Sequence, residues 1–215
     1  MLKAMIRIQW KACWHLVLAL AVAAFALPLV SVRLGWKGAA NLPFYLTQLQ
    51  LWGLLYPTLA LITAIVLAVA AWASDRRGHH TYAMLLPIPR RRYVLLRYLT
   101  GLVMMIPIVL ALWLGAILAT TTLELPPGIR VFPHAIALKF TLSLLVLFGF
   151  AFAAAAASGR TLGYGLRLLG LFLAVHVALL MLTPRTNLIW SLVGILTSWP
   201  GPLAPLGGRW MLIDV

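Results

Sequence analysis

Long apolar runs alternate with short polar connections along the chain. The runs cover residues 14–31, 44–73, 94–119, 133–157 and 166–182, and a shorter one covers 188–199. A helix needs roughly 17–25 apolar residues to cross the hydrocarbon core, so each of the first five is long enough. The pattern predicts an all-α, polytopic integral membrane protein with about six transmembrane helices.

The last run is the exception. At about 18 Å as a helix, residues 188–199 are too short to cross the core alone. The run either continues irregularly through Pro200, Pro202 and Pro205, or it dips into the membrane and returns. The second option needs non-helical backbone that is buried in protein.

The first residues are basic and precede an apolar run. Lys3, Arg7 and Lys11 share one helical stripe, which predicts an interfacial helix over residues 1–12. A basic start followed by Ala24-Phe25-Ala26 also resembles a secretory signal peptide. Because Pro28 follows closely, we interpret the run as an uncleaved signal anchor with its N-terminus in the cytoplasm.

Composition and charge agree with a membrane protein. Hydrophobic residues make up 64% of the chain and charged residues 9%, and the formal net charge is +14. The basic residues lie almost wholly between the apolar runs, so they are topology signals and contacts to anionic lipid rather than to nucleic acid. With six spans the inner side holds Lys3, Arg7, Lys11, Arg76, Arg77, Arg90, Arg91, Arg92, Arg97, Arg160, Arg167 and Arg209. A five-span alternative moves only Arg209 to the outer side.

Several kinds of chemistry are missing from the sequence. None of the three acidic residues, Asp75, Glu124 and Asp214, lies mid-span, which argues against an ion-driven carrier. The phosphate-loop pattern GxxxxGK[ST] and hydrolase arrangements do not occur, and a single cysteine, Cys13, excludes an internal disulfide. We therefore expect a chain that is not an enzyme, has no metal or cofactor of its own, and takes energy from another subunit.

Three features of the second half are candidates for helix contacts. The alanine run from Ala153 to Ala157 predicts a packing face, because small residues permit close backbone approach in lipid. Gly159 and Gly163 form one GxxxG spacing, which fits a packing face or a flexible turn. His176, near the middle of the fifth run, is a candidate for an interhelical hydrogen bond or for a haem ligand.

The longest polar connection, residues 75–98, contains an apolar patch. Tyr82-Ala83-Met84-Leu85-Leu86 lies between basic residues, and Pro87 and Pro89 terminate the patch. A merely solvated loop does not need such a patch. The pattern predicts a short amphipathic helix at a membrane face that binds a partner.

This connection resembles the coupling region of permease subunits of type-2 ABC exporters. The resemblance rests on Asp75, Gly78 and Thr81, on residues 85–90 (LLPIPR) and on Arg97. It implies a single permease domain over residues 1–215, with a cytoplasmic coupling loop at 74–97 in the cell inner membrane. It also implies a second permease subunit and a separate ATPase that binds ATP and Mg²⁺. The implied ATPase contacts are Arg76, Gly78, Thr81, Tyr82, Met84, Leu85, Leu86, Pro87, Pro89 and Arg90.

Two other functions remain open at this point. One is a scaffold or accessory subunit of a larger membrane complex, which uses the helices only for packing. The other is a haem-handling permease of cytochrome biogenesis, for which His176 is the relevant residue. Uncharged spans suit a hydrophobic or amphiphilic substrate without specifying its identity.

Overall fold

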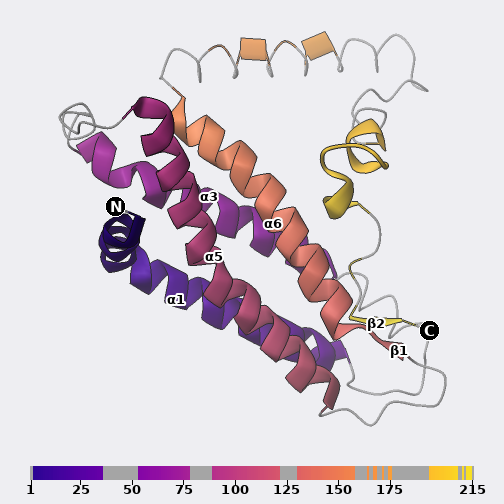
Figure 1. Ribbon diagram of the computed structural model, residues 1–215. Helices are drawn as coiled ribbons and strands as arrows, with labels where there is room; N and C mark the ends of the chain where they lie inside the picture. Colours follow the sequence, from indigo (N-terminus) through magenta and orange to yellow (C-terminus); the bar gives the residue numbers. More distant parts are fainter. Residues whose placement is uncertain are drawn as a thin grey trace.

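Four long helices dominate the fold (Figure 1). The computed structural model describes residues 2–35, 53–77, 89–121, 130–157, 194–207 and 212–214, with residues 164, 167, 168, 171, 174, 175 and 210. The helices are α1 (Leu2–Gly35), α3 (Leu55–Arg77), α5 (Arg90–Thr121) and α6 (Pro133–Ala156). All four are long and apolar enough to cross a membrane. The described part of the chain therefore has the fold of a helical membrane protein.

α1 and α5 run side by side in the same direction. Gln9 of α1 lies against Thr100 near the start of α5, with 2.6 Å between their side-chain oxygens. Further along both helices, the backbone of Phe25 approaches Gly115. A first and a third span that run in parallel fit a chain that crosses the membrane back and forth.

α3 and α6 run in the opposite direction. The hydroxyl of Ser31, near the end of α1, lies 3.2 Å from the hydroxyl of Tyr56 at the start of α3. The ring of Phe152, near the end of α6, contacts both Trp72 of α3 and Tyr98 of α5. The starts of α1 and α5 therefore lie at the same end of the bundle as the ends of α3 and α6.

This shared end collects most of the positive charge. We call it the arginine-rich end, defined by Lys3, Arg7, Lys11, Arg76, Arg77, Arg90, Arg91, Arg92 and Arg97. The opposite end holds the last turn of α1, the first turns of α3 and α6, and the last turn of α5. The concentration of basic residues at one end was predicted from the sequence.

The C-terminal residues lie along α6 and end away from Leu2. Pro205, in a 3-10 turn η1 (Ala204–Leu206), accepts a hydrogen bond of 2.9 Å from the Ser143 hydroxyl. Strand β2 (Ile213–Asp214) pairs antiparallel with β1 (Arg130–Val131), just before α6. Figure 1 shows the two chain ends at opposite ends of the bundle. This placement favours the five-span alternative over six spans with both ends on one side.

The helix boundaries bear on two parts of the prediction. Residues 2–12, which the sequence predicted to lie in the membrane interface, are the first part of α1, a continuous helix from Leu2 to Gly35, and their interfacial location stays a prediction. Residues 74–97 do not form one loop, since α3 extends to Arg77 and α5 begins at Arg90. The connector between the helices is therefore limited to residues 78–89.

A regular stripe of buried alanines lies on α3. Ala60, Ala64, Ala68 and Ala71 are fully buried, and they recur every three or four residues along one helix face. In the alanine run of α6, by contrast, Ala153 is exposed. The packing face predicted for Ala153 and Ala157 therefore stays a prediction, while the stripe on α3 supplies close packing among the described helices.

Candidate functional site

Arg97 ties α3 to α5 at the arginine-rich end. Its guanidinium donates to the hydroxyl of Tyr93, one turn earlier, from Nε at 3.1 Å and from Nη2 at 2.8 Å. Nη1 donates to the backbone carbonyl of Ala71 in α3. The guanidinium also lies over the Tyr93 ring, 5.3 Å from its centroid. A charge-assisted bond to a carbonyl is stronger than a neutral one, so this contact fixes the two helix ends relative to each other.

A second polar contact joins α1 to the same part of α5. The Thr100 hydroxyl oxygen lies 2.6 Å from Gln9 Oε1 and 2.7 Å from the Arg97 carbonyl oxygen. A hydroxyl has one proton, so it donates to only one of these acceptors at a time. Gln9 Nε2 is buried and has no hydrogen-bond partner among the described residues. A buried amide with spare donors makes this a polar junction within an apolar bundle.

Sequence reasoning missed the junction of Gln9 and Thr100, although a signal was present. Gln9, Cys13 and Val17 are buried and repeat every four residues, so they form one face of α1. The Cys13 thiol donates to the Gln9 backbone carbonyl at 2.8 Å. A glutamine on the packing stripe of a membrane helix indicates a polar contact with a neighbouring helix.

The predicted ATPase contacts fall into two groups. Arg76 belongs to the last turn of α3, Arg90 is the first residue of α5, and Pro89 is exposed just before it. The Pro89 carbonyl accepts hydrogen bonds from the backbone N–H groups of Arg92 and Tyr93. The remaining members lie outside the described residues: Gly78, Thr81, Tyr82, Met84, Leu85, Leu86 and Pro87.

The other candidates are settled only in part. Gly159, Gly163 and His176 lie outside the described residues, so the GxxxG contact and the haem ligand stay predictions. His134, at the opposite end of the bundle, accepts a 3.0 Å hydrogen bond at Nδ1 from the Trp113 indole. Within the described ranges, no group of three His, Cys, Asp or Glu residues could hold a metal ion.

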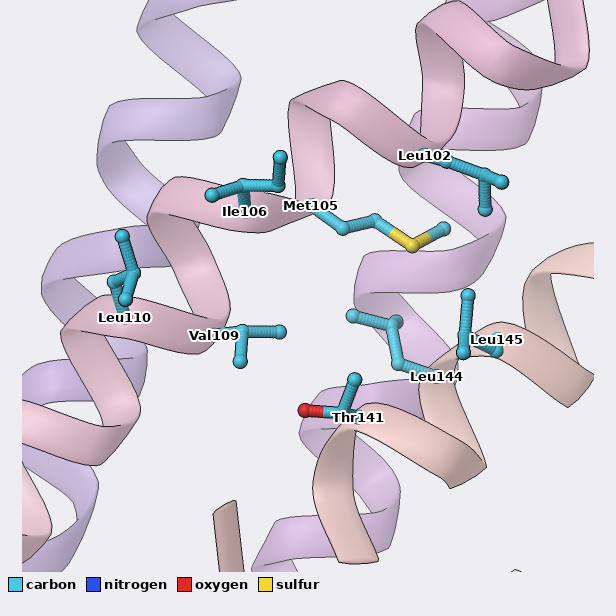
Figure 2. A pocket seen from close by; sticks show the side chains of 8 residues that line it. All are labelled: Leu102, Met105, Ile106, Val109, Leu110, Thr141, Leu144 and Leu145. Atoms are coloured by element: carbon cyan, nitrogen blue, oxygen red, sulfur yellow. The ribbon is translucent and has the colours of Figure 1, made fainter. Parts of the chain in front are cut away.

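An apolar groove lies between α5 and α6 (Figure 2). It has a volume of about 230 Å³ and is lined by Leu102, Met105, Ile106, Val109, Leu110, Thr141, Leu144 and Leu145. Thr141 is the one polar lining residue, and its hydroxyl already donates to the Ala137 carbonyl at 2.7 Å. Ile106 and Leu110 are about half exposed, so the groove opens towards the membrane. Its lining suits hydrocarbon and offers no free hydrogen-bond donor.

The fold and these contacts define a polytopic helical membrane protein with a polar junction at its arginine-rich end. Comparison with protein-family models, with curated proteins and with solved structures gave no significant match for the chain.

Proposed function

We propose that the chain is the membrane-spanning permease subunit of a type-2 ABC exporter. It moves a hydrophobic or amphiphilic substrate and is energised by a separate ATPase subunit. One observation carries the proposal: Arg97 holds the last turns of α3 beside the first turns of α5. The connector between Arg77 and Pro89 therefore starts and ends at the arginine-rich end, where an amphipathic connector can meet a partner.

The polar contacts link this connector mechanically to the helix bundle. A force on residues 78–89 reaches α3 and α5 directly, and the Arg97–Ala71 bond keeps these two helices in register. The Gln9–Thr100 contact extends the linkage to α1. In this proposal the partner supplies ATP and Mg²⁺ chemistry, and the chain supplies helices that move as a unit. The excess of basic residues supports a cytoplasmic location for the arginine-rich end.

The coupling function is tested by charge substitution in the connector. The variant Leu85→Asp/Leu86→Asp puts two carboxylates into the apolar patch, so we expect co-purification of the ATPase to fall about tenfold or more. The matched control is Leu54→Asp/Phe132→Asp, which changes two exposed apolar residues at the opposite end of the bundle. Co-purification that survives in the connector variant and equals the control would refute the coupling assignment.

One observation favours a scaffold subunit as the second candidate. The groove that the described helices form is apolar and small, about 230 Å³, and its one hydroxyl already donates its proton, so it offers an amphiphilic substrate no donor for its polar part. A scaffold would form a stable membrane complex without ATP-dependent flux. Reconstitution of the purified complex in vesicles, with ATP added on the side of the arginine-rich end, separates the two functions.

A further inference from the structure

We infer that the groove between α5 and α6 holds an acyl chain of an anionic phospholipid, whose phosphate contacts Arg91 and Arg92. This lipid site goes beyond the transport proposal and does not depend on an ATPase partner. The inference rests on the chemistry of the groove, on the α5 face that leads away from it, and on the charge at the end of that face.

The groove accepts hydrocarbon and little else. Met105 and Leu144 form its floor, with exposed fractions of 4% and 1%, and Ile106 at the rim is 53% exposed. Figure 2 shows side chains from both helices pointing into the space between them. Because the only hydroxyl in the lining, that of Thr141, already donates its proton to the Ala137 carbonyl, the groove offers a polar group no donor and at most one hydroxyl acceptor in place of water.

The face of α5 that lines the groove leads to Arg91. Residues 91, 95, 98, 102, 105 and 109 are spaced by three or four, so they lie on one face of the helix. At 1.5 Å per residue, Arg91 is about 16 Å along the axis from Leu102. Half of a hydrocarbon core of about 30 Å is a similar length. A lipid with its phosphate beside Arg91 therefore places the far part of its chain in the groove.

Between Arg91 and the groove, the surface of α6 leaves space for the acyl chain of the lipid. Gly149 lies one turn beyond Leu145 towards the arginine-rich end, and a side-chain carbon added at Gly149 would meet only the Tyr98 hydroxyl, at 3.9 Å. Ala153 and Ala156, further along α6, are small and exposed. The Tyr98 ring packs against Phe148 and Phe152 of α6, so in this proposal the acyl chain runs over the outer side of Tyr98, along the small residues of α6.

The charge at the end of this path selects an anionic headgroup. Arg91 and Arg92 are exposed in the first turn of α5, where the N-terminal backbone amides add partial positive charge. An anionic phospholipid places its phosphate at these arginines and its acyl chain in the groove.

The headgroup half of the inference is tested by lipid retention in native mass spectrometry. The purified protein in neutral detergent is titrated with dipalmitoyl phosphatidylglycerol or with phosphatidylcholine of the same chains. We expect wild type to retain the anionic lipid preferentially, and Arg91→Gln/Arg92→Gln to bind it about tenfold more weakly. The matched control, Arg7→Gln/Lys11→Gln, removes two exposed charges from α1 at the same end and should change binding less than about twofold.

The groove half is tested by filling it. Leu145→Trp occupies the groove, Gly149→Leu blocks the path past Tyr98, and Leu18→Trp changes an exposed leucine on α1 as the control. We expect both fillings, but not the control, to weaken binding of the dipalmitoyl lipid by about tenfold. A six-carbon-chain analogue should bind wild type and both filled variants equally, because its chains do not reach the groove.

Three results would overturn the lipid site. An equal loss of anionic-lipid binding in both charge variants would mean that the lipid is attracted to the arginine-rich end in general and not to Arg91 and Arg92. If Leu145→Trp and Gly149→Leu kept the melting temperature of wild type and bound the dipalmitoyl lipid as strongly, the groove would not hold the acyl chain. Light scattering that shows a dimer in wild type and a monomer in Leu145→Trp, with unchanged lipid binding, would assign the groove to a second copy.

Discussion

Trp210 joins the C-terminal residues to two helices at the opposite end of the bundle. Its ring stacks on Tyr56 of α3 with a centroid distance of 6.4 Å, and Lys139 Nζ lies 4.9 Å from the centroid of the Trp210 ring. Its indole N–H donates to the Leu206 carbonyl at 3.0 Å. Trp210 is only 7% exposed, and its one hydrogen-bond donor has a partner. It therefore stabilises the packing of the C-terminal residues on α3 and α6 through buried apolar surface, ring stacking and a cation–π contact.

We expect Trp210→Ala to destabilise the protein by about 3 kcal/mol, since it removes a buried aromatic side chain together with these contacts. Trp10→Ala is the control, because Trp10 is 46% exposed on α1; its effect should stay within about 0.5 kcal/mol. Denaturation in mixed micelles, followed by circular dichroism, gives both values. Equal losses from the two substitutions would contradict the packing role of Trp210.

At the scale of elements, α1 and α5 pack closest at a glycine. A side-chain carbon placed at Gly115 would lie 2.3 Å from the Phe25 carbonyl oxygen. That oxygen belongs to the backbone of α1, so it cannot move away as a flexible side chain would. Inside a membrane no hydrophobic effect drives helices together, so they associate through van der Waals contact, which close approach at small residues increases.

Gly115→Ala should therefore separate α1 from α5 and cost about 1–3 kcal/mol of stability. Gly149→Ala makes the same chemical change in α6, where the added carbon meets only the Tyr98 hydroxyl at ordinary contact distance. That control should be neutral or stabilising by up to about 1 kcal/mol, because alanine favours the helix. Thermal unfolding of the two variants in one detergent compares them directly, and a stable Gly115→Ala would contradict the close packing.

The sequence predicted helices better than it predicted their contacts. The fourth apolar run matches α6 almost to the residue, because Pro133 suits a first turn and the run ends in alanines. The buried alanine stripe of α3, with Ala60 and Ala64, was not predicted. When every side of a helix is apolar, periodicity does not distinguish the side that faces lipid from the side that faces another helix. Gln9 carried a usable signal that was also missed, because a buried polar group needs a hydrogen-bond partner.

At the scale of the whole molecule, the helix directions and the β1–β2 pair bear on the number of crossings. α1 starts at the arginine-rich end, and Ala157 returns the chain to that end after four candidate spans. β2 pairs with β1 at the opposite end, which favours an odd net number of crossings. A re-entrant segment adds no net crossing, so the five-span alternative fits both the helix directions and the charge bias.

Cysteine accessibility in intact cells tests this topology. In a Cys13→Ala background, we expect Arg130→Cys and Asp214→Cys to react with a membrane-impermeant maleimide added outside, because β1 and β2 pair at the end with few basic residues. Lys3→Cys and Arg92→Cys should react only after the membrane is permeabilised, since the arginine-rich end faces the cytoplasm in our proposal. If Asp214→Cys reacted on the same side as Lys3→Cys while Arg130→Cys reacted on the other, the β1–β2 pair and the odd number of crossings would both be wrong. If all four positions exchanged sides, the fold would still be correct. Only the proposed orientation would be wrong, and with it the proposal that a cytoplasmic ATPase binds the connector.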